Sequence, residues 1–219
     1  MMTTRNVAFI ALLGLATQLS TSFAMADGKF RMSLQGRTGF SLLNLTEQDG
    51  FREGVLDGTY AASVRDGDMF VMQIGQAVEQ MEVTVDGKYT LYSGFLHGKP
   101  SRITSVPYKD GFYVYGDVGG TEFRVSVDQK KGNLFMYWPY NDELEFLIDI
   151  NKNPQTAGAC KGMMHISGPG VSEEIAKVFC TGEGSLADTF FNNPEDVIAY
   201  LVHLNVFPDD NDDWLRRFR

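Results

Sequence analysis

Hydrophobic and polar residues alternate along much of the chain between Asp27 and Ile150. In KFRMSLQ, Phe30, Met32 and Leu34 alternate with polar residues, and the same period of two recurs in MEVTV, FRVSV and LEFLIDI. Alternation of this kind is typical of strands that bury one face and expose the other to water. Asp-Gly and Gly-Gly pairs separate these segments, where glycine supplies the positive φ that tight hairpin turns require. The pattern predicts a mainly β domain over residues 27–150, an antiparallel meander of about eight to ten short strands closed as a barrel or folded into a sandwich.

The pattern changes after Asn151. We expect NKNPQTAGA to be a loop and CKGMMHIS to be one further strand. Ser172 then looks like an N-cap, followed by two acids and an apolar pair four residues apart, which predicts a helix. A clearer helix is predicted from Asn193, with Pro194 at its first position and Pro208 at its end. We expect the region 151–219 to be a strand plus helices, packed on one face or one end of the same β domain.

The first 26 residues have the layout of a secretory signal peptide. Arg5 precedes the apolar run VAFIALLGLA, and the segment ends in Ala24-Met25-Ala26. The apolar run is about half the ~20 residues that a membrane-spanning helix needs. We therefore expect cleavage after Ala26, an exported protein in the periplasm or the medium, and no stable membrane insertion. A porin-like barrel is disfavoured because the sequence ends in a predicted helix and charges instead of an aromatic strand.

Cys160 and Cys180 are the only cysteines, and three chemistries are open to them. A catalytic thiol would need a base, for which His165 is the nearest candidate. A metal site would need more ligands than the spacing provides, so we expect none. In an oxidising compartment an isolated pair of thiols is usually joined. The sequence therefore predicts a disulfide that joins the last strand to the first C-terminal helix.

Net charge and sequence motifs reduce the number of function classes that fit this chain. The 219 residues include 19 Lys and Arg against 28 Asp and Glu, a net charge of −9, which argues against nucleic acid as a partner. The motif G-x-G-x-x-A at residues 182–187 lacks the βαβ unit of a dinucleotide site, so we expect no cofactor. The alternating acids Asp209 and Asp213 with Asn211 leave open a weak calcium site or a solvated turn. The sequence contains no H-E-x-x-H, G-x-S-x-G or S-x-x-K motif of the common hydrolases.

Aromatic residues are concentrated in FYVYGD (112–117) and LFMYWPY (134–140). Tyr113 and Tyr115 share one face of their segment, and Trp138 and Tyr140 share one face of theirs. If these segments and FRVSV are consecutive antiparallel strands, one row across the sheet collects these aromatic rings, with Arg124 as a polar contact. We predict that at least two of the four aromatic side chains are partly exposed and line a binding site. The alternative is a thick core in which helices cover the outer face.

Two classes of function remain open from the sequence. The first is an exported, non-enzymatic β-domain that binds a protein partner or a small apolar or aromatic ligand, as an accessory or inhibitor protein does. The second is a hydrolase or lyase that acts on a polymer outside the cytoplasm. A cleft with two convergent carboxylates would favour the enzyme, and an apolar cavity or aromatic patch would favour the binding protein.

Overall fold

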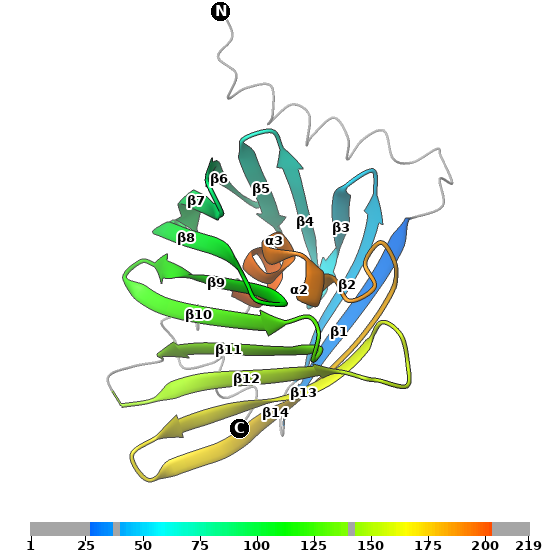
Figure 1. Cartoon of the computed structure of the whole chain (residues 1–219), viewed down its shortest axis with the longest axis vertical. Coiled ribbons are helices and arrows are strands. Elements are labelled where there is room, and N and C mark those ends of the chain that lie inside the picture. The colour runs from blue at the N-terminus through cyan, green and yellow to red at the C-terminus, as the bar shows by residue number, and fades with distance from the viewer. Residues whose placement is uncertain (1–26, 37–39, 140–142, 203–219) are drawn as a thin grey trace, which may run out of the picture.

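The structure is a computed structural model, and it describes residues 27–36, 40–139 and 143–202. Within these residues, 14 antiparallel strands form one closed barrel, in which neighbours along the chain pair and β14 returns to pair with β1 (Figure 1). The bounds are β1 (Gly28–Gly36), β2 (Phe40–Gln48), β3 (Phe51–Leu56), β4 (Thr59–Asp66), β5 (Met69–Ile74), β6 (Ala77–Asp86), β7 (Tyr89–Leu96), β8 (Lys99–Tyr108), β9 (Gly111–Val118), β10 (Thr121–Asp128), β11 (Asn133–Pro139), β12 (Glu145–Lys152), β13 (Ala159–Gly168) and β14 (Val171–Gly184). The predicted meander and its closure as a barrel are confirmed. The expected number of strands was too low.

Alternation along the strands places the core inside the barrel. In β10, Phe123, Val125 and Val127 are buried, whereas Arg124 is exposed on the outer wall. The same alternation runs through most of the other strands, so the inward faces form one apolar cluster. No helix among the described residues is long and apolar enough to cross a membrane.

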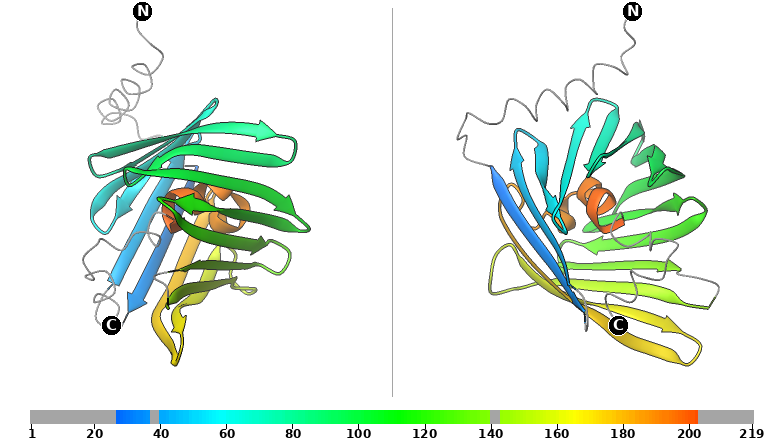
Figure 2. Two further views of the ribbon diagram at one scale, coloured as in Figure 1. Left: turned by 90° about the vertical axis from the view of Figure 1, so that its left-hand side faces the viewer. Right: turned by 180° about the vertical axis from the view of Figure 1, so that it is seen from behind.

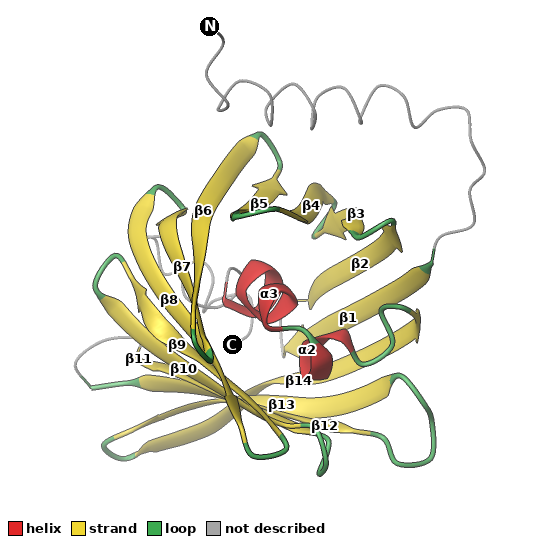
Figure 3. Cartoon of the chain, turned by 45° about the horizontal axis from the view of Figure 1, so that its top comes forward, coloured by secondary structure: helices red, strands yellow, loops and turns green. Residues whose placement is uncertain are grey.

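The helices after β14 lie inside the barrel. They are α2 (Thr189–Asn192), α3 (Pro194–Asp196) and the helical turn η1 (Val197–Val202). Figure 3 shows them surrounded by strands, and Figure 2 shows the same placement from two further sides. All six residues of η1 are buried, and the ring of Phe190 packs edge-on against Phe30 of β1 at 4.9 Å between centroids. The helices therefore pack on the inner face of the sheet, and the alternative in which they cover its outer face is wrong.

The predicted start of the last helix is confirmed. Asn193 is the N-cap, its side-chain oxygen accepts a hydrogen bond from the Glu195 N–H at 2.9 Å, and Pro194 stands in the first turn. The expected end of this helix at Pro208 lies outside the described residues, as do the predicted signal peptide and the acidic stretch from Asp209 to Asp213.

The helix predicted after Ser172 is wrong, because residues 171–184 form β14. This strand closes the barrel by pairing with both β13 and β1. The register between β13 and β14 shifts at Met164 and His165, which leaves Ile175 as an extra residue between Glu174 and Ala176. The extra residue leaves Ile175 and Ala176 both buried, and Phe179 faces outward with 43% of its surface exposed, so the apolar residues of β14 do not alternate strictly.

Inward glycines let the strands bend tightly around the core. A Cβ atom on Gly54 of β3 would lie 1.8 Å from the Asn44 carbonyl oxygen, and one on Gly116 of β9 would lie 2.1 Å from that of Arg102. Real Cβ atoms do not approach a backbone so closely, so these positions accept only glycine without a shift of the neighbouring strand. Gly116 directly follows Tyr115 on β9.

Cys160 and Cys180 form the predicted disulfide, but its position differs from the prediction. The two residues are direct cross-strand partners on β13 and β14, with their Cα atoms 4.9 Å apart, so the bond joins two strands and not a strand and a helix. Both side chains point inward and are buried, and the described residues include no free cysteine.

The double variant Cys160→Ser/Cys180→Ser should unfold with a free energy about 2–4 kcal/mol lower than the wild type, because the disulfide restricts the unfolded chain. Urea denaturation with and without a reducing agent measures the difference, and the reductant should have no further effect on the variant. Two titratable thiols in unfolded, unreduced wild-type protein would contradict the disulfide.

Candidate functional site

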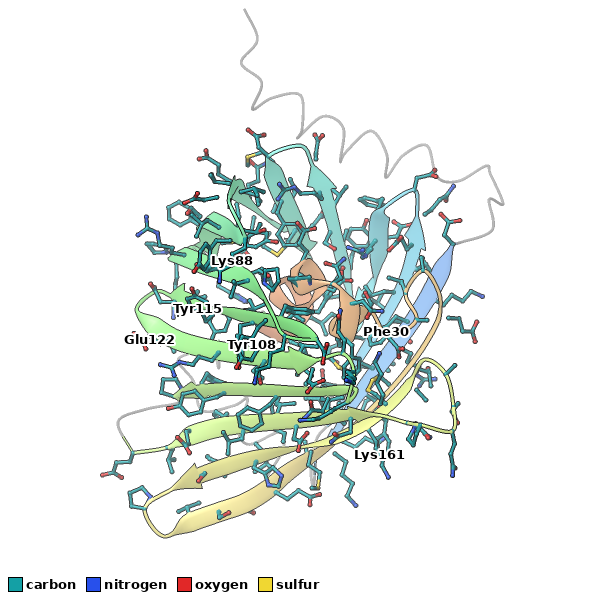
Figure 4. All side chains as sticks on the ribbon, in the orientation of Figure 1. Phe30, Lys88, Tyr108, Tyr115, Glu122 and Lys161 are labelled. Atoms are coloured by element: carbon teal, nitrogen blue, oxygen red, sulfur yellow. A yellow bond between two sulfur atoms is a disulfide. The ribbon has the colours of Figure 1, made fainter. Side chains whose placement is uncertain are left out.

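The outward side chains of β9, β10 and β11 form an aromatic depression on the outer wall. In the register of these strands, Ser126 stands directly between Tyr113 and Phe135. Because the serine side chain is short, Ser126 forms the floor of the depression, and the rings of Tyr113 and Phe135 form its two sides. Tyr115, which Figure 4 labels, belongs to the same strand β9 and is exposed.

A second row of side chains closes one end of this depression. Arg124 is the direct cross-strand partner of both Tyr115 and Tyr137. Cross-strand neighbours on one face lie about 4.5–5.5 Å apart at Cβ, which brings the guanidinium within reach of both rings. We call the whole hollow, which has a volume of about 680 Å³, the aromatic groove. Its lining residues are Tyr113, Val114, Tyr115, Arg124, Val125, Ser126, Phe135 and Tyr137.

A second hollow of about 540 Å³ adjoins the aromatic groove, and we call it the lysine notch. It lies between the β8–β9 turn and the β10–β11 turn, and it shares Tyr113 and Ser126 with the groove. The rings of Tyr108 and Tyr113 are 4.5 Å apart between centroids, so the aromatic surface continues from one hollow into the other. The lining residues of the notch are Tyr108, Lys109, Asp110, Gly111, Tyr113, Ser126, Val127, Asp128, Lys130, Lys131 and Asn133.

Ion pairs hold the carboxylates of the lysine notch. Lys130 reaches across the two turns to Asp110 at 3.8 Å, and Lys131 lies 3.5 Å from Asp128 in its own turn. The Lys131 backbone N–H donates to Asp128 at 2.9 Å, and this hydrogen bond lowers the pKa of Asp128. The Asp128 carboxylate is therefore ionised at neutral pH and unsuited to the role of general acid.

Lys109 and Tyr108 interact at the outer edge of the notch. The Lys109 amino nitrogen lies 4.9 Å from the centroid of the Tyr108 ring. Hydrogen bonding between the two side chains lowers the pKa of the Tyr108 hydroxyl and raises the pKa of Lys109. The raised pKa of Lys109 favours a charged lysine beside an aromatic face, which is the usual arrangement of a cation–π contact.

The structure brings together three of the five residues that the sequence proposed for binding. Tyr113, Tyr115 and Arg124 all line the aromatic groove, and Tyr115 is 40% exposed. Trp138 does not, because it lies on the inward face of β11, where it is 1% exposed and stacks on Phe146. Tyr140 lies outside the described residues.

Sequence reasoning missed Phe135 and Tyr137, which face outward beside Ser126 and Arg124. The signal was present in the alternation of β11, but every residue from 134 to 138 is large and apolar or aromatic, so alternation alone does not say which face is inside. In the structure Tyr137 pairs with the exposed Arg124, and this register shows that Phe135 and Tyr137 lie on the outer face of β11.

A buried ionic cluster connects the inner helices to the barrel wall. The Asp196 carboxylate is fully buried and lies 3.0 Å from Arg52 of β3, and the Thr189 hydroxyl donates to it. Arg52 also contacts Glu47 of β2 at 2.8 Å. Burial raises the pKa of Asp196 to about 6, and the positive charge of Arg52 opposes this shift. The cluster holds the helices in place and offers no surface to a ligand.

Further polar contacts extend this connection along the helices. Glu195 lies 3.5 Å from Arg65 of β4, and the Tyr92 hydroxyl of β7 donates to Glu195 at 3.4 Å. The hydroxyls of Ser63 and Tyr200, both buried, are 2.9 Å apart. Each end of the helical segment is therefore tied to the strands by paired polar groups, which is what burial of such groups requires.

The described residues contain no group of three His, Cys, Asp or Glu side chains placed to hold a metal ion. His165 and Glu174 are cross-strand neighbours on β13 and β14, but no hydrogen bond or ion pair joins their side chains among the described contacts. Comparison with models of known protein families, with curated proteins and with solved structures found no match for this chain.

Proposed function

We propose that the protein is an exported, non-enzymatic binding protein and that its ligand lies in the aromatic groove. The observation that carries this proposal is the exposure of aromatic rings around a hollow. Tyr115 and Phe135 are each 40% exposed at the sides of the groove. Exposed aromatic clusters are unfavourable in water and are characteristic of surfaces that a partner covers.

The position of the helices supports a ligand site on the outer wall. Many barrels hold a small ligand in the lumen. Here α2, α3 and η1 occupy the lumen, and the ionic pair of Asp196 with Arg52 ties them to the wall. A ligand that entered would have to displace buried apolar residues, whereas the groove on the outer wall is open.

Two features support export. The first 26 residues have the signal-peptide layout. The paired Cys160 and Cys180 suit an oxidising compartment, where disulfides form and persist.

The composition of the groove favours binding over hydrolysis. Among the described residues that line it, Arg124 alone carries a charge. In the neighbouring notch, Asp110 and Asp128 each form an ion pair with a lysine. An acid–base mechanism needs a carboxyl group that can hold or give up a proton near neutral pH, and the lowered pKa of Asp128 does not suit that role.

Ring-shaped probes test the proposal. Methyl β-glucopyranoside and indole, added to isotope-labelled protein, should shift the backbone amide resonances of β9, β10 and β11. The variant Tyr113→Ala/Tyr115→Ala should weaken this binding about tenfold, because flat aromatic contacts dominate such sites. Its free energy of unfolding should stay within about 1 kcal/mol of the wild type, as for other surface substitutions.

The variant Tyr89→Ala/Phe95→Ala is the matched control. These side chains are 39% and 55% exposed on the outer face of β7, away from the groove, so probe binding should be unchanged. The proposal is wrong if neither probe shifts amides of β9–β11. It is also wrong if loss of Tyr113 and Tyr115 destabilises the fold by several kcal/mol, because that result would indicate a core role.

A further inference from the structure

We propose that the aromatic groove and the lysine notch form one elongated site for an acidic oligosaccharide. The sugar rings would lie on the tyrosines of the groove, and carboxylates of the sugar would meet Lys109, Lys130 and Lys131. This inference rests on the proposed function, to which it adds the class of ligand.

The two hollows are continuous and carry positive charge at both ends. They share Tyr113 and Ser126, and the Tyr108 ring extends the aromatic surface into the notch. Arg124 lies four residues before Asp128 on β10, and this separation corresponds to ~13 Å at the usual rise of a strand. A ligand that reaches from Arg124 to the lysines must therefore be several rings long.

The charge of the notch differs from that of the whole chain. The chain carries a net charge of −9, yet three lysines and two aspartates line this one hollow, with Lys109 on the β8–β9 turn and Lys130 and Lys131 on the β10–β11 turn. Lys130 and Lys131 are each 79% exposed in their ion pairs, so their charges also remain available to a ligand. No carboxylate among the described residues lies within ion-pair distance of Lys109. A local cationic site on an acidic protein attracts an anionic ligand. Most of the remaining surface does not compete for that ligand, because it carries negative charge.

The shape of the site favours a sugar chain over a peptide. An extended peptide that adds to a sheet needs a free edge, and the described strands close the barrel without one. The outer wall of a barrel is convex, so it cannot enclose an apolar molecule as a deep pocket does. Tyr113, Tyr115 and Tyr137 each offer a flat ring with a hydroxyl at its edge, which matches a ligand with flat faces and a hydroxylated rim.

Two pairs of tetrasaccharides separate charge from ring stacking. β-1,4-linked tetraglucuronate differs from cellotetraose only in the carboxylate at C6, and α-1,4-linked tetragalacturonate is compared with its neutral counterpart in the same way. Calorimetric titration of the full mature chain should show tighter binding of an acidic member than of its neutral partner. This preference should fall as salt is raised, because screening weakens exposed charge pairs.

The variant Lys109→Gln/Lys130→Gln should weaken binding of the acidic tetrasaccharide about tenfold, since each exposed pair contributes up to about fivefold. Binding of the neutral tetrasaccharide should not change. The control variant Lys88→Gln removes an exposed lysine beside Tyr89, outside the site, and should bind like the wild type.

Three outcomes would overturn the inference. The first is equal binding of the acidic and neutral tetrasaccharides, and the second is unchanged binding of the acidic tetrasaccharide by the lysine variant. The third is binding of the acidic peptide Glu-Pro-Glu-Pro-Glu-Pro that is tighter than binding of the acidic tetrasaccharide. If methyl glucopyranoside and indole still shift the amides of β9–β11 in those cases, the proposed function stands and only the class of ligand is wrong. If no ring probe shifts these amides, both proposals fail.

Discussion

Replacement of Trp138 by alanine is expected to lower the free energy of unfolding by about 3–5 kcal/mol, the usual cost of removing a large buried aromatic side chain. Trp138 is 1% exposed, and its ring stacks on Phe146 of β12 at 4.9 Å between centroids. Its loss would leave a cavity in the apolar cluster that lines the barrel. Urea denaturation followed by circular dichroism measures the change.

Phe135 is the matched control because it lies on the same strand and faces outward. It is 40% exposed, and Phe135→Ala should change the free energy of unfolding by less than about 1 kcal/mol. The same variant should weaken binding of ring probes, since Phe135 forms one wall of the aromatic groove. Equal destabilisation by both substitutions would show that β11 does not separate a core face from a binding face.

The contrast between these two residues shows how far the sequence could predict the site. Alternation in FYVYGD and FRVSV correctly grouped Tyr113, Tyr115 and Arg124 on one face. In LFMYWPY both faces are rich in large side chains, so the choice between Trp138 and Tyr137 depends on the register with β10. Register is set by long-range packing of the closed barrel, which local periodicity does not contain.

The fold was predictable where strands alternate strictly and turns are marked by glycine. The pattern is harder to interpret where other demands change it. In β3 the inward positions hold Arg52, Gly54 and Leu56, a mixture that resembles neither a buried nor an exposed face. In β14, which the sequence pattern assigned to a helix, the extra residue Ile175 interrupts the alternation.

Arg52 also shows why the placement of the helices was not predictable. On its own strand it has the character of an ordinary surface arginine, and Asp196 has that of an ordinary first-turn acid. The ion pair between them explains both positions, because Arg52 points into the barrel and neutralises a carboxylate that has no contact with water. Long-range pairs of this kind leave no periodic signal in a single sequence.

The variant Arg52→Ala is expected to lose about 3–5 kcal/mol of stability near pH 8, because it leaves the buried Asp196 carboxylate without its cation. Arg52 holds the pKa of Asp196 down against burial, so its removal should raise that pKa above the value of about 6 in the wild type. A carboxyl group whose pKa is higher in the folded protein than in the unfolded chain adds stability at low pH. That added stability is lost as the pH rises through the folded pKa. The penalty of Arg52→Ala should therefore shrink as the pH falls from 8 to 5, where Asp196 becomes protonated and neutral.

Three further variants test whether the charge of Asp196 causes the loss of stability in Arg52→Ala and its dependence on pH. Asp196→Asn should remove the part of the pH dependence that Asp196 contributes, so the wild type should gain stability relative to this variant as the pH falls from 7 to 4. The double variant Arg52→Ala/Asp196→Asn should be more stable than Arg52→Ala at pH 8, because it no longer buries an unpaired charge. Arg65→Ala, which removes a partly exposed arginine from Glu195, should cost about 1 kcal/mol or less. Urea denaturation at each pH gives all of these values. A penalty for Arg52→Ala that is the same at pH 5 and pH 8 would mean that Asp196 is not the charge that Arg52 stabilises.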